Sequence, residues 1–247
     1  MYEQTGSYYA LFGPQAAVTA AEERFFAHWI EGRRKALDLG AGLCGPATML
    51  ARMGLEVLAF EPEPALAVLA LDRLGRGDEF ARRVTLVEGS VEEFAEPFAA
   101  DVILLRSVLM LLDDSKRAAA LEAARRHAAA DARLIVDVRT AALPWAEQGS
   151  AIEEKRIGHT LFRRMTDYER DASGATLVHW KVDAERFGRS QQLARESFRV
   201  RADTPQDLEQ LLQRSGFAIE QLYGGYDLDL PYTDSSAMLV AIAQRSE

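Results

Sequence analysis

A glycine-rich turn at residues 38–45 is the part of the sequence best suited to chemistry, and it reads Asp-Leu-Gly-Ala-Gly-Leu-Cys-Gly. Gly40, Gly42 and Gly45 have the spacing G-x-G-x-x-G, which lets another molecule lie against bare backbone at a helix N-terminus. The same pattern marks sites for nicotinamide and flavin dinucleotides, so alone it predicts only a nucleotide-like ligand. Asp38 is more discriminating, because dinucleotide-binding sequences usually carry an apolar residue two positions before the first glycine.

Glu61 is the second candidate, because it directly follows the run Glu-Val-Leu-Ala-Phe of residues 56–60. A carboxylate at the end of a second strand can accept hydrogen bonds from both hydroxyl groups of a ribose. A nicotinamide dinucleotide needs the same acid. Glu61 therefore predicts a ribose and leaves open which cofactor carries it.

Residues 38–42 have the order acid-x-Gly-x-Gly, and in this the chain resembles the class I methyltransferase family, which binds S-adenosylmethionine (SAM). Residues 7–12, Ser-Tyr-Tyr-Ala-Leu-Phe, resemble the opening of the small-molecule branch of that family, with Ala10 in place of its aspartate. The family usually has its third glycine where this chain has Cys44, followed here by Gly45. The resemblance implies a SAM-dependent transferase that methylates a nitrogen, oxygen or carbon of a small molecule, such as a natural-product or metabolite intermediate.

The resemblance also implies a cofactor site built from the ends of successive strands. In this family the N-terminal segment folds over SAM, the segment after the third strand holds adenine, and the residues after the fourth strand face the methionine moiety. Carried onto this sequence, the cofactor-binding residues are Tyr9, Asp38, Gly40, Ala41, Gly42, Glu61, Pro62, Gly89, Ser90, Val91, Arg106 and Ser107.

Methyl transfer from a sulfonium is an in-line displacement, so the main task of the protein is to align the reactants and exclude water. An amine or phenol acceptor also needs a base, and an imidazole is suited to take its proton at neutral pH. Our candidate for the catalytic base is His159, which follows Gly158 at a bend. The residues that we expect to bind the acceptor are Tyr8, Met110, Trp145, His179, Trp180 and Tyr226.

Such a site needs a parallel sheet to position it. Short apolar runs predict five strands, at residues 35–39, 56–60, 84–88, 101–105 and 134–138, and helical spacing predicts helices at 46–53, 64–74 and 115–127. Two further strands are predicted at 217–223 and 237–243. The alternation of strands and helices predicts a Rossmann-like, doubly wound α/β fold whose seven-stranded sheet has five parallel strands and the antiparallel ending of the methyltransferase family.

An insertion is expected at residues 150–203, after the fifth strand. Segments 160–171, 176–185 and 192–201 predict an antiparallel meander of three strands, followed by a helix that begins at Thr204 and Pro205. We interpret the insertion as a lid over the acceptor or as a contact in a homo-oligomer. As a lid over the acceptor side, the segment is expected to contribute little to SAM affinity.

Composition limits the possible partners. The chain has 247 residues, of which 48% are hydrophobic, enough for one methyltransferase domain spanning residues 1–247. A formal net charge of -9 disfavours nucleic acid and anionic membranes, and favours a small-molecule substrate. A single cysteine, Cys44, excludes a cysteine zinc site, and we expect no metal. Without a long apolar run or a signal-peptide pattern, the chain is expected to be cytoplasmic.

Two other functions stay open from the sequence alone. A nicotinamide-dependent oxidoreductase is favoured by the glycine spacing and opposed by Asp38 and the antiparallel ending. A SAM-binding protein without transferase activity would need the cofactor motif and no base.

Overall fold

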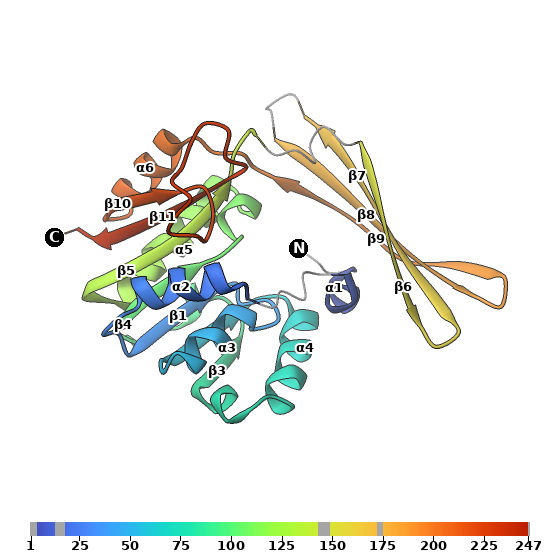
Figure 1. The fold of residues 1–247 in the computed structure, drawn as a ribbon, viewed down its shortest axis with the longest axis horizontal. Helices are drawn as coiled ribbons and strands as arrows, with labels where there is room; N and C mark the ends of the chain where they lie inside the picture. The colour runs from blue at the N-terminus through green and yellow to red at the C-terminus, as the bar shows by residue number, and fades with distance from the viewer. Residues whose placement is uncertain (1–3, 13–17, 143–148, 172–174, 247) are drawn as a thin grey trace.

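The computed structural model describes residues 4–12, 18–142, 149–171 and 175–246 (Figure 1). The main sheet contains β1 (Lys35–Leu39), β2 (Glu56–Glu61), β3 (Val84–Glu88), β4 (Ala100–Leu105), β5 (Ala128–Arg139), β10 (Phe217–Tyr223) and β11 (Met238–Arg245). The α-helices are α1 (Gly6–Phe12), α2 (Ala20–Trp29), α3 (Gly45–Arg52), α4 (Pro64–Gly75), α5 (Asp114–His127) and α6 (Pro205–Arg214). Short 3₁₀ helices are η1 (Glu79–Arg83), η2 (Val91–Glu93) and η3 (Leu109–Leu111). None of the helices within these ranges is long and apolar enough to cross a membrane.

The main sheet has the order β10-β11-β5-β4-β1-β2-β3. Strands β1 to β5 pair in parallel, and β11 runs antiparallel to both of its neighbours, β5 and β10. This confirms the predicted seven-stranded, doubly wound fold. The central strands β1 and β4 are covered on both faces, which explains why their sequences are largely apolar.

Two layers of helices cover the main sheet (Figure 1). Leu37 of β1 belongs to a core cluster with Leu121 of α5 and Leu212 of α6. Its neighbour Ala36 belongs to the cluster on the other side, which contains Phe25 of α2. Alternate residues of one strand thus enter opposite cores, as the pleat requires.

A second sheet projects from the main one and is formed by β6 (Ser150–Ile157), β7 (Thr160–Arg170), β8 (Thr176–Arg186) and β9 (Arg189–Val200) (Figure 1). Its strands are antiparallel in the order β6-β7-β8-β9. The prediction of three strands was wrong, because β6 is a mostly exposed edge strand that lacks an apolar run. Ion pairs from Glu153 to Arg164 and from Glu154 to Arg163 link β6 to β7.

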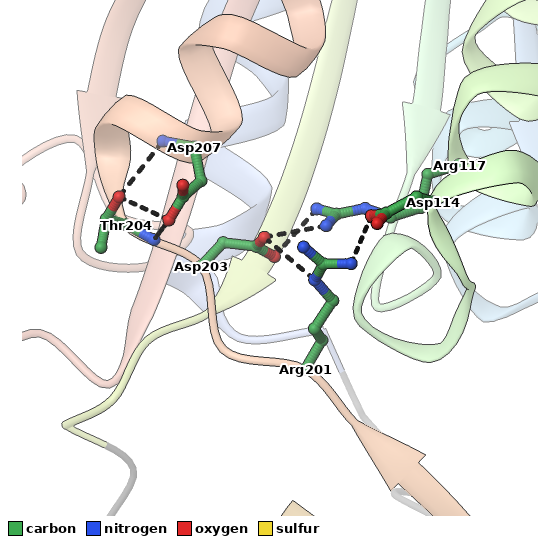
Figure 2. Close-up of polar contacts among 6 residues, drawn as sticks. All are labelled: Asp114, Arg117, Arg201, Asp203, Thr204 and Asp207. Atoms are coloured by element: carbon green, nitrogen blue, oxygen red, sulfur yellow. Dashed lines mark hydrogen bonds and ion pairs between the residues drawn. The ribbon is translucent and has the colours of Figure 1, made fainter. Parts of the chain in front are cut away.

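The second sheet rejoins the main domain through a junction that contains a buried ion pair (Figure 2). Arg117 of α5 donates two hydrogen bonds of 2.8 Å to the two carboxylate oxygens of Asp203. Arg201 binds Asp114 through an ion pair, and its backbone N–H donates to the carbonyl of Met110 at 2.9 Å. The junction therefore fixes the end of β9 against both α5 and η3.

The same junction also holds the end of β5. The backbone N–H of Asp203 donates to the carbonyl of Arg139 at 2.8 Å. Thr204 then begins α6, where its side chain accepts from the N–H of Asp207 at 3.1 Å while the Asp207 carboxylate accepts from the N–H of Thr204 at 3.0 Å. This reciprocal cap confirms the helix start predicted from the sequence.

Candidate functional site

The turn after β1 lies against the end of β2. The N–H groups of Gly40 and Ala41 both donate to the carbonyl of Phe60 at 2.9 Å. Gly40 has a φ of 74°, and a Cβ atom built on it would lie 2.5 Å from Cγ2 of Val108, whereas a Cβ on Gly42 would meet nothing within 4 Å. Gly40 is thus required by the fold itself. At Gly42 the backbone is uncovered, so a ligand can lie directly against it.

Glu61 is held across this turn. Its carboxylate accepts from the N–H of Gly42 at 2.7 Å and from the N–H of Glu63 at 2.9 Å, and the residue is 5% exposed. Burial raises the pKa of Glu61, while the two backbone donors oppose this by stabilising the charged form. The carboxylate is therefore fixed in position at the carboxyl edge of the sheet, where ligands of such folds bind.

Asp38 lies beneath the turn and is almost completely buried. Its Oδ2 atom has no hydrogen-bond partner among the described residues. Burial raises the pKa of Asp38 to about 7, an effect that the charge of Arg106 opposes. A buried carboxyl with a free oxygen is a suitable partner for a cationic group of a ligand, because a nearby positive charge favours its ionised form.

The segment after β4 is held by two carboxylates that the sequence analysis missed. Arg106 donates to Glu22 of α2 at 2.6 Å. Ser107 has a φ of 58°, and both its N–H and its hydroxyl bind the carboxylate of Asp137 in β5. Asp137 could have been identified from the sequence, because it is the one acid within the apolar run Leu-Ile-Val-Asp-Val, and the structure buries it. Glu22 has the Thr-x-x-Glu pattern of a capped helix, which α2 confirms.

The segment after β3 lies beside the end of β2. The N–H of Gly89 donates to the carbonyl of Glu61 at 3.1 Å, and Gly89 has a φ of 137°. Ser90 precedes η2, and Val91 is buried in the core cluster that also contains Phe60. The structure therefore brings the segments after β1, β2 and β3 to one edge, as their parallel pairing demands.

Helix α1 places the two N-terminal tyrosines beside the second sheet. The ring centroid of Tyr9 lies 6.3 Å from that of Trp180 in β8, and Tyr8 packs against the cluster around Phe12. Burial raises the pKa of Tyr9, with charge effects from Arg164, Glu61 and Arg106. The ring of Tyr9 thus lies near Trp180, and its neighbour Ala10 lines one cavity with Leu43 and Gly45 of the glycine turn.

The structure does not bring His159 to this edge. His159 lies in the turn between β6 and β7 and is exposed, with its ring 6.0 Å from that of Phe187 in the turn between β8 and β9. Strand β7 has 11 residues, so the turn at its start lies about 35 Å from its other end. This placement gives the predicted catalytic role of His159 no geometric support.

His179 and Trp180 point to opposite faces of the second sheet, because neighbouring residues alternate along β8. His179 bonds to Ser197 at 2.7 Å on the outer face, while Trp180 lies on the face that α1 covers. The two predicted acceptor contacts therefore cannot line one pocket, and only Trp180 is near Tyr9. The strand register, which the sequence does not give, decides this.

Three other predicted acceptor residues have different positions. Tyr226 is 7% exposed and is stacked at 5.3 Å on Phe26, with Arg106 lying 4.7 Å over its ring, so it belongs to the core. Met110 lies in η3, next to the segment after β4. Trp145 lies outside the described residues.

Comparisons with known proteins agree with this arrangement. Residues 37–136 match the family model described as a methyltransferase domain. The chain is similar to the CcbJ methyltransferase from Streptomyces caelestis, with 15% identity, a TM-score of 0.76 and coverage of 99% of this chain and 97% of that one. No curated protein sequence matches the chain.

Two more solved structures are similar over nearly the whole chain. The sugar N-methyltransferase KedS8 from Streptoalloteichus has 16% identity and a TM-score of 0.75, with 97% of this chain and 93% of that one covered. The amino pentose methyltransferase CalS10 from Micromonospora echinaspora, solved with bound SAM, has 17% identity and a TM-score of 0.71, with 97% and 96% covered. At these identities the similarity establishes the fold.

Proposed function

Because residues 37–136 match a methyltransferase domain model and the whole chain has the fold of solved methyltransferases, we propose that it is a SAM-dependent enzyme that methylates an amino group of a small molecule, with amino sugars as the favoured class. The finer part of this proposal draws on KedS8 and CalS10, which are described as sugar N-methyl and amino pentose methyltransferases. Their low identity makes the acceptor a matter for experiment.

The residues at the strand ends fit SAM. Glu61 is placed to accept the ribose hydroxyls, Gly42 leaves backbone open to the ligand, and the unpartnered oxygen of Asp38 suits the ammonium group. The segment 89–91 is assigned to adenine by its position after β3. When bound, SAM supplies an electrophilic methyl group on a positively charged sulfur.

The position of the histidines favours nitrogen as the methylated atom. The chain has four histidines, and His28, His127, His159 and His179 lie on α2, at the end of α5, at the tip of the second sheet and on its outer face. An alcohol acceptor needs a base before it can attack, whereas a neutral amine already carries a free electron pair. A site without an imidazole therefore suits an amine, whose proton is lost after transfer.

The acceptor is assigned to the region between η3, which lies against β9, and Tyr9 of α1, which lies near Trp180 of β8. In this proposal the insertion at residues 150–203 forms the acceptor wall of a single domain spanning residues 1–247. Tyr9 and Trp180 contribute aromatic faces, which suit both the hydrophobic side of a sugar and the cationic sulfur. The residues here orient the acceptor and exclude water, which is the main requirement of in-line transfer.

The proposal is tested with purified protein, SAM and pairs of sugars that differ only in carrying an amino or a hydroxyl group at one position. We expect mass spectrometry to detect addition of one methyl group to the amino sugar and none to its hydroxyl partner. Methylation of the hydroxyl compound, or of neither member of any pair, would contradict the assignment of an amino sugar.

Replacing His159 by alanine is expected to leave the methylation rate within about twofold of wild type, because His159 lies at the tip of the second sheet. Loss of an essential base would instead lower the rate roughly 10²–10⁴-fold. Initial rates with an amino sugar that the paired assay finds to be methylated measure this. A loss of a hundredfold would show that the tip of the second sheet reaches the reacting atoms in solution.

Binding of S-adenosylhomocysteine is expected to strengthen as the pH rises, because Asp38 has a pKa of about 7 in the free protein and the ligand ammonium favours its charged form. The association constant should rise by at most about tenfold between about pH 6 and pH 8. Titration calorimetry measures the slope, and Asp38→Asn should abolish it. An equally steep slope in that variant would assign the titration to another group.

A further inference from the structure

Helix α1 lies between the main domain and the second sheet, with α4 on one side of it (Figure 1). Phe12, at the end of α1, is 6% exposed and packs in one cluster with Val182 of β8 and Ala194 of β9. Val182 and Ala194 are paired across the strands, so they share one face of the second sheet, which we call the inner face. The sheet thus provides the apolar contact that α1 requires.

Polar contacts reinforce this attachment at both ends of the helix. The backbone N–H of Thr5 donates to Glu196 on the inner face at 3.2 Å, and the Thr5 hydroxyl binds the same carboxylate. The guanidinium of Arg164 lies 5.5 Å from the ring centroid of Phe12 and 4.5 Å from that of Trp180, with its Nε donating to Glu153 at 2.8 Å. Contacts on both sides of Tyr9 therefore fix the helix to the inner face.

Tyr9 lies between these two anchors. Its neighbour Ala10 lines one cavity with Leu43 and Gly45 of the glycine turn, so α1 lies against the cofactor edge. The charges of Glu61 and Arg106 act on the pKa of Tyr9, in agreement with this placement. A helix of 7 residues is too short to be stable alone in water. The position of Tyr9 at the cofactor edge thus depends on the sheet that holds α1.

We propose that the second sheet is part of the cofactor site, because its inner face, through Val182, Ala194 and Arg164, holds α1 so that Tyr9 closes over SAM. These three are positioning residues, since they act through α1. The proposal reverses the expectation that the insertion contributes little to SAM affinity. It rests on the SAM site and does not depend on the identity of the acceptor.

The test measures the affinity of S-adenosylhomocysteine by calorimetry. Phe12→Ala should raise the dissociation constant about fivefold to tenfold, because α1 is then docked in only a fraction of the molecules. Ala194→Leu, which fills the position occupied by Phe12 from the side of the sheet, should weaken binding similarly. Met165→Ala is the matched control, since Met165 lies on β7 next to Arg164 but on the outer face.

A double-variant cycle separates positioning from a general loss of stability. With Tyr9→Ala already present, Phe12→Ala should change the dissociation constant less than about twofold, because the residue that it positions is gone. The proposal is overturned if Phe12→Ala and Ala194→Leu bind with wild-type affinity. It is overturned equally if the effects of Phe12→Ala and Tyr9→Ala multiply in the double variant.

Discussion

Replacing Glu61 by alanine is expected to weaken SAM binding by roughly 10²–10⁴-fold. The carboxylate is fixed at the end of β2 and is placed to accept both ribose hydroxyls. Each charge-assisted hydrogen bond contributes about 1.5–3 kcal/mol, and each 1.4 kcal/mol corresponds to about tenfold in affinity. The lower end of the range is expected, because the same oxygens also accept from the N–H groups of Gly42 and Glu63.

Calorimetry with SAM and with S-adenosylhomocysteine measures this effect, and circular dichroism verifies the fold. Glu63→Ala is the control, since alanine keeps the backbone N–H that residue 63 donates to Glu61, and this variant should bind SAM normally. Gly40→Val is a poor probe of the same site, because its side chain would clash with Val108 whether or not a ligand binds. Wild-type affinity in Glu61→Ala would show that Glu61 does not bind the ribose hydroxyls.

Replacing Arg117 by alanine is expected to lower the free energy of unfolding by about 3–5 kcal/mol. Arg117 and Asp203 are 2% and 3% exposed, so the change leaves the Asp203 carboxylate buried without its bidentate partner (Figure 2). Arg201, with its Nε 3.7 Å from Asp203, compensates in part and favours the lower end. Urea unfolding measures the loss.

A paired apolar replacement identifies the cause. Arg117→Met combined with Asp203→Leu should recover most of the stability, because a buried ion pair and an apolar pair of similar volume are often equivalent. If Arg117→Ala lost less than about 1 kcal/mol, or if the double variant were no more stable than it, the ion pair would not be what fixes the junction.

The sequence predicted the main sheet well because its central strands are apolar on both faces. Strands β1 and β3 have the predicted bounds, and β2 is longer by one residue, Glu61. Strand β5 starts at Ala128 instead of residue 134, since its first residues, Ala-Ala-Ala-Asp-Ala-Arg, have little strand propensity. There, pairing with the rest of the sheet overrides the local preference.

The second sheet and α1 were harder to predict, because tertiary contacts define them. Strand β6 is charged and exposed, so no apolar pattern in the sequence predicts it, and its pairing with β7 defines it as a strand. Helix α1 depends on Phe12 packing against β8 and β9, more than 160 residues later in the sequence. The face occupied by His179 follows from a register that no local pattern determines.

The candidate site was predictable to the extent that it follows strand ends. Asp38, Glu61 and the glycine turn come directly after apolar runs, and parallel strands bring such residues together. Glu22 and Asp137 were missed, because they act through Arg106 and Ser107 across the sheet. Such partners become evident only when the neighbouring strands and helices are placed.

A crystal structure with S-adenosylhomocysteine tests the central claim most directly. We predict that the ribose hydroxyls bind Glu61, that the amino group approaches Asp38, and that the sulfur faces the rings of Tyr9 and Trp180. A ligand bound elsewhere, or with its sulfur directed away from the second sheet, would contradict the assignment of both the cofactor edge and the acceptor wall.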